Sequence, residues 1–465
     1  MRNRVLYFLY ITFRVSEVKN EKQEDKYKMS KKRDFVTHIK TVFNPVYLVA
    51  QLVGLAPYSF VDAEDVVDIS WNSNRKNFIW SILLLIIQSV GVFYRLAINF
   101  IKPPTSILQL CCNVVSLPLV QAAGPLAVAI GLVRNRTKMR QIVRILSAVD
   151  PFLYESSDKV YRKRESFLVV ALTCSLLYVF PLYFVQNYMS EDIATEWLLT
   201  LSHVTCIVSD LQYINLLVIL RHRLVAISDK LRMTYIIEFC AREELKIPTK
   251  NFKPRGRHVS GTTSRPVVGN QSIFTVQSFE KTESLECSIS DSRSAMAGII
   301  LMVRQNYNAL CEVCSLINSI HGFTLVVNWL VATVSMSVDL YYVTVSFMFP
   351  SISDKLSSSA TMNVALILWS LFMLVRMFVI ALSCQWVSDE YRTCMSNVER
   401  LLLEYSNEED VLTQLVSFTD QLVNNKIELT ACGIFTMNLS VLCTVAGLVI
   451  QYFILLCQMR DSSKP

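Results

Sequence analysis

The chain has 465 residues, of which 52% are hydrophobic and 18% are charged. Soluble proteins of this length are less apolar, and several apolar runs are long enough to cross a bilayer, so the composition excludes an ordinary soluble fold and indicates an all-α membrane protein. The net charge of +7 would suit nucleic acid, but Lys and Arg cluster in loops between the apolar runs, which argues for a topology signal and against a nucleic-acid partner.

The N-terminal region, residues 1–77, is expected to be cytoplasmic. Residues 1–28 have the character of an extension ahead of a second start at Met29, and the short apolar stretch within them lacks the cleavage site of a signal peptide. Residues 43–55 are apolar, but prolines bracket them, so they predict an interfacial helix and not a span.

Seven segments are predicted to span the membrane because each is a long, nearly uncharged apolar run. In chain order they are 78–101, 106–133, 167–185, 197–220, 320–348, 362–384 and 434–458. The first four lie within 78–220, and the fifth and sixth lie within 320–384. Seven crossings place the two ends of the chain on opposite sides of the membrane.

The distribution of Lys and Arg fixes the predicted orientation. These residues are frequent before the first span and in the second-to-third and fourth-to-fifth connections, and they are scarce in the alternate connections. The positive-inside rule therefore predicts a cytoplasmic N-terminus and an extracellular tail, residues 460–465. This topology is the reverse of that of a G-protein-coupled receptor.

Two cytoplasmic regions are predicted to be largely helical. Residues 221–319 extend the fourth and fifth helices around a loop, 248–292, whose Ser, Thr and basic residues predict disorder. Residues 385–433 have apolar positions at helical spacing, interrupted by a turn at Ser406 and Asn407.

Signs of catalysis are poor, so we expect no enzyme. The five histidines lack metal-ligand spacing, and the pair Cys311 and Cys314 lacks the second pair that a zinc site needs. The chain has no phosphate-binding loop and no G-x-S-x-G motif. We therefore expect neither metal nor cofactor, and no structural disulfides among the 13 cysteines.

Charges inside the predicted spans are the better indication of function, because each is costly in a membrane and commonly faces a cavity or a partner. Asp210 and Asp339 fit a structural hydrogen bond and a ligand pocket equally well. Arg376 fits a structural ion pair better than a ligand contact, and Arg95 fits a side chain that reaches the interface.

Aromatic residues near these charges suggest a pocket for a small organic ligand, although an interfacial aromatic belt is the alternative. The candidate ligand-binding residues are Asp210, Tyr213, Trp329, Asp339, Tyr342 and Trp369. The few polar side chains in the sixth span favour a ligand less polar than a sugar.

The seventh span carries two glutamines in an apolar run. Gln451, Leu455 and Gln458 are spaced i, i+4 and i+7, so they share one face of a helix. Amides with an apolar ring between them suit a pore wall, because they can replace part of an ion's hydration shell. The alternative is that the glutamines pair between helices.

The end of this span resembles the C-terminal signature of insect gustatory receptors, which is Thr-Tyr, five hydrophobic residues and Gln-Phe. Tyr452, the spacer 453–457 and Gln458 match, whereas Gln451 replaces the Thr and Met459 replaces the Phe. The segments ELTACGIFTMNLSVL, which begins at Glu428, and GLAPYSF, which begins at Gly54, also look like this family.

The resemblance implies a tetrameric, ligand-gated cation channel in the plasma membrane, with 434–459 as the pore helix and 385–433 within the cytoplasmic anchor domain that joins subunits. It implies that Gln458 and Met459 lie at the pore constriction, and together with the shared helical face this gives the predicted pore or gate residues Gln451, Tyr452, Leu455, Gln458 and Met459. The implied partners are a small-molecule tastant, monovalent and divalent cations, membrane lipids, and identical or related subunits. An odorant receptor subunit that needs a co-receptor, a polytopic transporter and a G-protein-coupled receptor are the alternatives.

Overall fold

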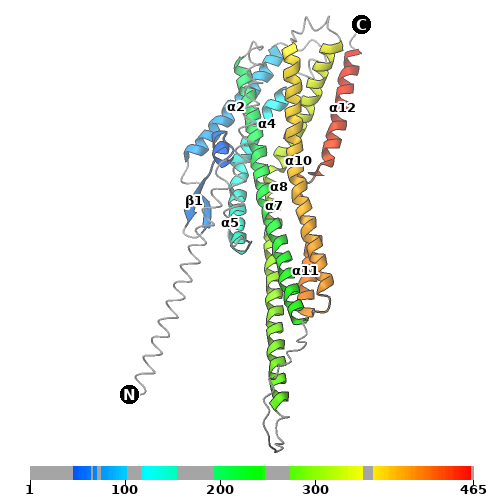
Figure 1. Cartoon of the computed structure of the whole chain (residues 1–465). Coiled ribbons are helices and arrows are strands. Elements are labelled where there is room, and N and C mark those ends of the chain that lie inside the picture. Colours follow the sequence, from blue (N-terminus) through cyan, green and yellow to red (C-terminus); the bar gives the residue numbers. More distant parts are fainter. Residues whose placement is uncertain are drawn as a thin grey trace, which may run out of the picture. The chain divides into compact units, whose positions relative to one another are not determined.

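The computed structural model describes residues 46–63, 66–70, 75–101, 117–153, 193–246, 273–348 and 360–461, and this part of the chain is mainly helical (Figure 1). The labelled helices are α2 (Arg75–Ile101), α4 (Leu117–Val133), α5 (Asn135–Leu153), α7 (Ile193–Lys246), α8 (Ile273–Met348), α10 (Ala360–Glu404), α11 (Glu409–Asn424) and α12 (Ser440–Asp461), and residues 46–52, within the predicted interfacial helix, are helical as well. The strands form two antiparallel hairpins, β1 (Ser59–Ala63) with β2 (Val66–Ser70) and β3 (Thr430–Ala431) with β4 (Phe435–Thr436).

Within the described residues, five helices have the length and composition to cross a membrane. Their candidate spans are Arg75–Ile98, Trp197–Met233, Met296–Phe347, Ala360–Glu404 and Ser440–Gln458. They overlap the first, fourth, fifth, sixth and seventh predicted spans, and the shorter apolar helix Pro118–Val133 overlaps the second. The third predicted span, 167–185, lies outside the described residues. The chain is therefore a helical membrane protein with several crossings.

The fold divides into two compact units. Unit 1 comprises Met1–Arg223, Ala309–Asp389 and Ile427–Pro465, and unit 2 comprises Leu224–Asn308 and Glu390–Lys426. Helices α7, α8 and α10 each contribute residues to both units. Each unit has its own buried side chains, so we describe them separately.

Helix α7 is the most enclosed helix of unit 1. In its most apolar window 83% of the residues are buried, against 11% in that of α12. Its neighbours include α4 and α8, because Cys206 clusters with Val120 and Ala123 of α4 and with Val331 of α8. Helix α12 presents most of its surface outwards, which in a membrane means towards lipid or towards another subunit.

The order of contacts gives the relative directions of the helices in unit 1. Two pairs, His203–Trp369 and Tyr213–Cys384, join α7 to α10, and two, Asp210–Asn328 and Tyr213–His321, join α7 to α8. A third set joins α8 to β4 and α12, through Trp329–Phe435 and Tyr341–Leu456. From one pair to the next, both residue numbers increase in the first and third sets, so those helices are parallel. In the second set one number increases while the other decreases, so α7 and α8 are antiparallel. Helices α7 and α10 thus run one way and α8 and α12 the other, as alternate membrane crossings require.

Helix α5 is joined to α7 by a buried ion pair. Arg223 Nη2 lies 2.7 Å from Asp150 Oδ2, and both side chains are at most 2% exposed. Burial raises the pKa of the Asp150 carboxyl, while the Arg223 guanidinium acts in the opposite direction. Removal of either partner would leave an unpaired charge in the core.

Unit 2 is organised around the apolar face of α11. Val411, Leu415, Phe418 and Leu422 recur at helical spacing and are all buried. Phe418 packs edge-on against Tyr307 of α8, with the ring centroids 5.6 Å apart. The turn at residues 405–407 separates α10 from α11, at the Ser406 and Asn407 that the sequence indicated.

Two boundaries differ from the sequence prediction. Helix α8 begins at Ile273, inside the range 248–292 that was predicted as a disordered loop. Helix α12 begins at Ser440 and not at Ile434, because the β3–β4 hairpin extends to Thr436 and three further residues precede the helix. Asn438 Oδ1 accepts a hydrogen bond of 3.1 Å from the Ser440 backbone N–H, so its side chain caps the new helix.

Candidate functional site

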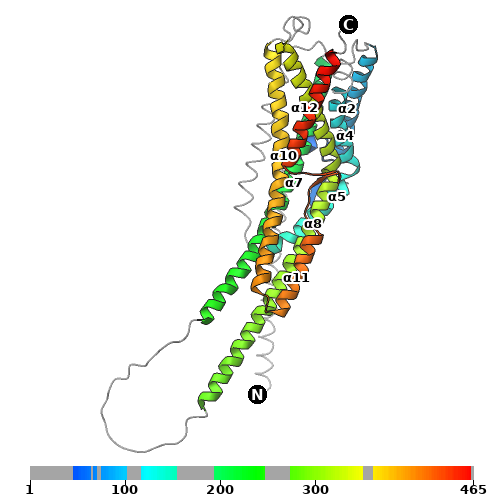
Figure 2. The same ribbon diagram turned by 90° about the vertical axis from the view of Figure 1, so that its right-hand side faces the viewer.

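Helix α12, red in Figures 1 and 2, has two unlike faces. Gln451, Leu455 and Gln458 are exposed and lie on one stripe, as their spacing predicted. On the other side Leu456 is fully buried, and Val445, about three helical turns earlier, is 7% exposed. The face that carries both amides is thus the face that α12 turns away from its own chain.

The buried face of α12 packs against α8. Leu456 clusters with Val338 and Tyr341, and the partly buried rings of Tyr342 and Tyr452 pack on this cluster. Tyr452, expected at the pore or gate, therefore lies on the α8 side and not on the glutamine stripe. Tyr342, expected in the ligand pocket, contacts the same cluster. The side chain of Met459 lies outside the described residues.

The segment that leads into α12 is fastened to α8 through one asparagine. Asn318 Nδ2 donates a hydrogen bond of 2.8 Å to the Glu428 carbonyl, and Asn318 Oδ1 accepts one of 3.2 Å from the Thr430 backbone N–H. The amide thereby satisfies two backbone groups of the β3–β4 segment. Helix α8 consequently fixes the point from which α12 starts.

The turn of this hairpin rests directly on Gly322 of α8. A Cβ atom at position 322 would stand 2.8 Å from the Cys432 backbone nitrogen, closer than atoms pack. Cys432 and Gly433 both have positive φ angles, 54° and 72°, which make the turn tight. Neither Asn318 nor Gly322 was singled out from the sequence, because only the fold brings them to the hairpin.

Asp210 lies in a polar cluster of three helices. Its carboxylate forms an ion pair with Arg376 Nε of α10, and its Oδ1 accepts a hydrogen bond of 2.9 Å from Asn328 Nδ2 of α8. Asp210 is 3% exposed, so the attraction within the ion pair compensates for the hydration that both charged groups lose on burial. The ion pair favoured for Arg376 from sequence is present, and Asp210 is its partner. Arg376 Nη2 is buried without a hydrogen-bond partner among the described residues.

Two predicted aromatic residues line the same α7–α10 contact. Trp369 meets His203 edge-on, with the ring centroids 4.7 Å apart, and packs on a cluster that includes Ile207. Tyr213 is fully buried, and its Oη lies 3.3 Å from Cys384 Sγ. These contacts lie on either side of Asp210 along α7, so the structure brings Asp210, Trp369 and Tyr213 to one interface.

Asp339 and Trp329 of α8 have other neighbours. Asp339 Oδ2 accepts a hydrogen bond of 3.0 Å from Ser370 Oγ, next to Trp369 in the chain. Trp329 is 4% exposed, its ring lies 6.4 Å from that of Phe435 in β4, and its Nε1 lacks a hydrogen-bond partner among the described residues. The six candidate ligand residues therefore fall on α7, α8 and α10, with Trp329 and Tyr342 directed towards the α12 segment.

The described side chains offer little to a metal. Within the described ranges, no group of three or more His, Cys, Asp and Glu could hold an ion.

The polar groups that the sequence did not single out, Asn328 and His203, became visible only as neighbours of Asp210 and Trp369. A charge in an apolar helix signals that a partner exists, but not which helix supplies it.

Comparison with known proteins gives one family and one fold. A family model described as "7tm Chemosensory receptor" matches residues 43–462. The insect olfactory receptor OR5 from Machilis hrabei has a similar structure, with a TM-score of 0.59 at 10% identity over 91% of this chain and 99% of that one. The same receptor in complex with eugenol gives a TM-score of 0.49 at 11% identity over the same shares. A search of curated protein sequences gives no match.

Proposed function

The chain belongs to the 7tm chemosensory receptor family, and from that premise we propose that it is a gustatory receptor of the plasma membrane that works as a ligand-gated, nonselective cation channel. The Tyr452 and Gln458 of the C-terminal signature favour a gustatory over an odorant receptor. The family is one of receptors and not of enzymes.

The observation that carries this proposal is the exposed stripe of α12. In a single chain within a membrane, the exposed side of α12 that carries Gln451 would face hydrocarbon, which is costly for a polar side chain. Four copies of α12 around a central axis would instead place both amides in a water-filled pore. The opposite face is already occupied by α8, so the stripe is the face left for this assembly.

The stripe has the chemistry of a weakly selective pore. Amide oxygens coordinate cations without holding them as tightly as carboxylates would. In a tetramer the four Leu455 side chains would form an apolar ring between the two glutamine positions, and this ring can close the ion path by excluding water. Small rotations of α12 about its contact with α8 would change the width at this ring. We assign the gate to Leu455 and Gln458, with Met459 after them.

The ligand is proposed to bind between α7, α8 and α10, near Trp369, Asp339 and Arg376. The buried Nη2 of Arg376 is a donor available to a carbonyl or hydroxyl oxygen, and the Trp369 ring supplies an apolar wall. The three helices move relative to one another if a ligand enters. Tyr342 and the Asn318 contact with Glu428 carry such a movement of α8 to α12.

The direct test is expression in cells without other receptors, an agonist screen by calcium imaging, and patch-clamp recording of the responses. We expect a ligand-evoked cation current that persists when G proteins are blocked. Gln458→Ala should change conductance or gating, whereas Ile450→Ala should not, because Ile450 is also exposed but lies about 100° around the helix from Gln451.

Other outcomes identify the alternatives. A current that appears only with a second receptor subunit would favour the odorant receptor assignment. Substrate uptake without unitary openings would favour a transporter, and a current abolished by the block of G proteins would refute the channel. A C-terminal tag that is reached only in permeabilised cells would refute the proposed orientation.

A further inference from the structure

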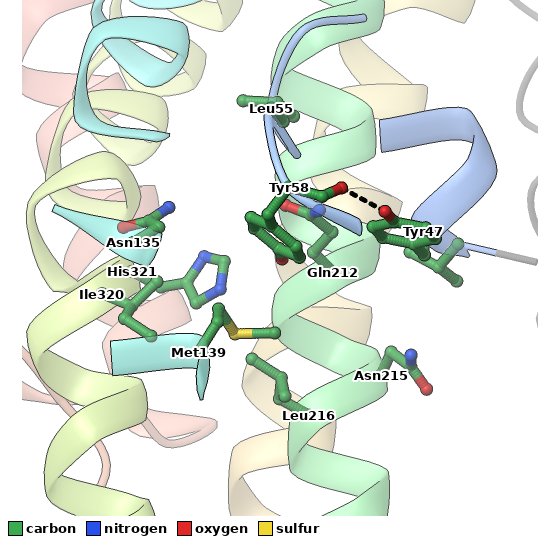
Figure 3. A pocket seen from close by; sticks show the side chains of 11 residues that line it. Tyr47, Leu55, Tyr58, Asn135, Met139, Gln212, Asn215, Leu216, Ile320 and His321 are labelled. Carbon is green, nitrogen blue, oxygen red and sulfur yellow. Dashed lines mark hydrogen bonds between the residues drawn. The ribbon is translucent and has the colours of Figure 1, made fainter. Parts of the chain in front are cut away.

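Helices α5 and α8 of unit 1 meet along a closely packed contact (Figure 3). Asn135 and Met139 of α5 and Ile320 and His321 of α8 line one small cavity there, together with residues of α7 and the segment 46–58. The volume of this cavity is about 20 Å³, which is room for one water molecule. The inner side of the contact is therefore closed to a larger ligand, and the outer side carries polar side chains.

Two cationic side chains meet on the outer side of this contact. Arg134, in the turn between α4 and α5, donates a hydrogen bond of 3.5 Å from Nη2 to Ser319 Oγ of α8. Lys138 Nζ, about one helical turn later, donates to the same oxygen. The Arg134 side chain is exposed and the other two are half-buried, so a ligand from solvent can reach all three. A neutral hydroxyl is thus the meeting point of two positive charges.

The two positive charges repel each other. Among the described residues, no Asp or Glu forms an ion pair with Arg134 or Lys138. Burial and the neighbouring Arg134 guanidinium both lower the pKa of the Lys138 ammonium. Glu312, about two helical turns before Ser319 on α8, accepts a hydrogen bond of 2.6 Å from Gln141 Nε2. An anion bound between the two cations would replace their repulsion by attraction.

The three donors match a phosphate monoester. Arg134 can donate two parallel N–H bonds, Lys138 supplies a compact positive charge, and the Ser319 hydroxyl keeps its own O–H to donate. A phosphate monoester offers three acceptor oxygens and a charge of about −1.5 to −2 at neutral pH, close to the opposite of the two cations together. A carboxylate or a phosphate diester carries a single negative charge, so one cation would stay uncompensated.

The position along the chain favours a lipid as the source of the phosphate. Arg134 is the first residue after the second predicted span, 106–133, and Ser319 is the last residue before the fifth, 320–348. In the orientation proposed above, this is the cytoplasmic edge of the membrane, where the headgroups of anionic lipids lie.

We propose that Arg134, Lys138 and Ser319 bind the phosphate monoester of an anionic lipid headgroup. The bound headgroup joins α5 to α8 one residue from Asn318, which fastens the hairpin ahead of α12. The choice of the cytoplasmic leaflet rests on the proposed orientation, whereas the binding itself requires no channel activity.

The test is native mass spectrometry of the purified full-length chain in detergent, titrated with phosphatidic acid. We expect one phosphatidic acid per chain to bind more tightly than phosphatidylglycerol, which is a diester, or phosphatidylcholine. Arg134→Gln and Lys138→Gln should each raise the half-saturating concentration about tenfold, because each removes one charge-assisted hydrogen bond. Lys138→Arg keeps the charge and should retain binding. Ser319→Ala, which removes only the hydroxyl, should raise that concentration about threefold.

The matched control is Arg144→Gln, which removes the same charge from an exposed position on α5, almost three helical turns from Arg134. This variant should bind phosphatidic acid as the unaltered chain does. An equal loss in Arg144→Gln, equal binding of phosphatidylglycerol, or unchanged binding in Arg134→Gln, Lys138→Gln and Ser319→Ala overturns the proposal. Inorganic phosphate at the lipid's concentration should not compete, because it lacks acyl chains, and displacement by it would assign the site to free phosphate and overturn the lipid.

Discussion

Gly322 of α8 lies directly beneath Cys432, with only 2.8 Å between the Cys432 backbone nitrogen and the place where a Cβ atom of residue 322 would stand. The absence of a side chain at residue 322 therefore lets the β3–β4 turn sit on α8. Because α12 starts directly after this hairpin, the contact sets where the proposed pore helix begins. Movement of α8 would reach α12 through it.

We predict that Gly322→Ala destabilises the protein by about 1–3 kcal/mol, because the new methyl group must displace the backbone of the turn. Gly298→Ala is the matched control, since Gly298 lies on the same helix with no atom within 4 Å of its Cβ position. Alanine should leave stability there unchanged or raise it by up to about 1 kcal/mol. Thermal unfolding of the purified variants checks this, and equal effects would contradict the proposed contact.

The ion pair between Asp210 and Arg376 gives a second prediction. Arg376→Met or Asp210→Leu alone should cost about 3–5 kcal/mol, because either leaves a buried charge without its partner. The double variant should recover most of this loss. Ser370→Ala, which removes only the hydroxyl bound to Asp339, should cost about 1 kcal/mol. A double variant no more stable than the singles would show that the two charges do not compensate each other.

The proposed ligand and pore residues should separate in electrical recordings. Trp369→Ala and Asp339→Ala should shift the agonist concentration for half-maximal current without a change in ion selectivity. Gln458→Ala should alter conductance or selectivity with little change in agonist sensitivity. Reversal potentials measured with two different cations distinguish these effects. Altered selectivity in the first two variants would contradict the placement of the pocket.

The sequence predicted the class of fold because membrane spans leave a direct signal in long apolar runs. It placed the helical core of α2, α7, α8, α10 and α12, and the spacing of Gln451 and Gln458 correctly predicted one shared face. It missed the β3–β4 hairpin, since strands of two residues leave no periodic pattern. That hairpin shortened the predicted seventh helix at its start.

The site was less predictable because its contacts join residues far apart in the chain. The sequence showed that the charge of Asp210 would be costly inside a membrane span. It did not show the partners, Arg376 and Asn328, because they come from two other helices. Tyr452 was grouped with the pore by the signature, whereas its packing against Leu456 and the α8 cluster depends on which side of α12 faces α8. Periodicity alone gives faces of a helix, and tertiary contacts decide what each face meets.

The most direct test of the central claim is cross-linking between copies of α12, which needs no agonist. Cys443 is exposed and Cys457 is half-buried, so both are first replaced by serine in the full-length chain. Single cysteines are then introduced as Gln458→Cys and, on the α8-facing side, as Val449→Cys. A bifunctional maleimide is added to membranes, and covalent dimers are compared with the serine background.

We expect dimers and higher products for Gln458→Cys and only the background level for Val449→Cys. The stripe of Gln451, Leu455 and Gln458 would then face other copies of the chain. Equal cross-linking at the two positions, or none at position 458 in protein that reaches the membrane, would contradict a pore lined by this face of α12.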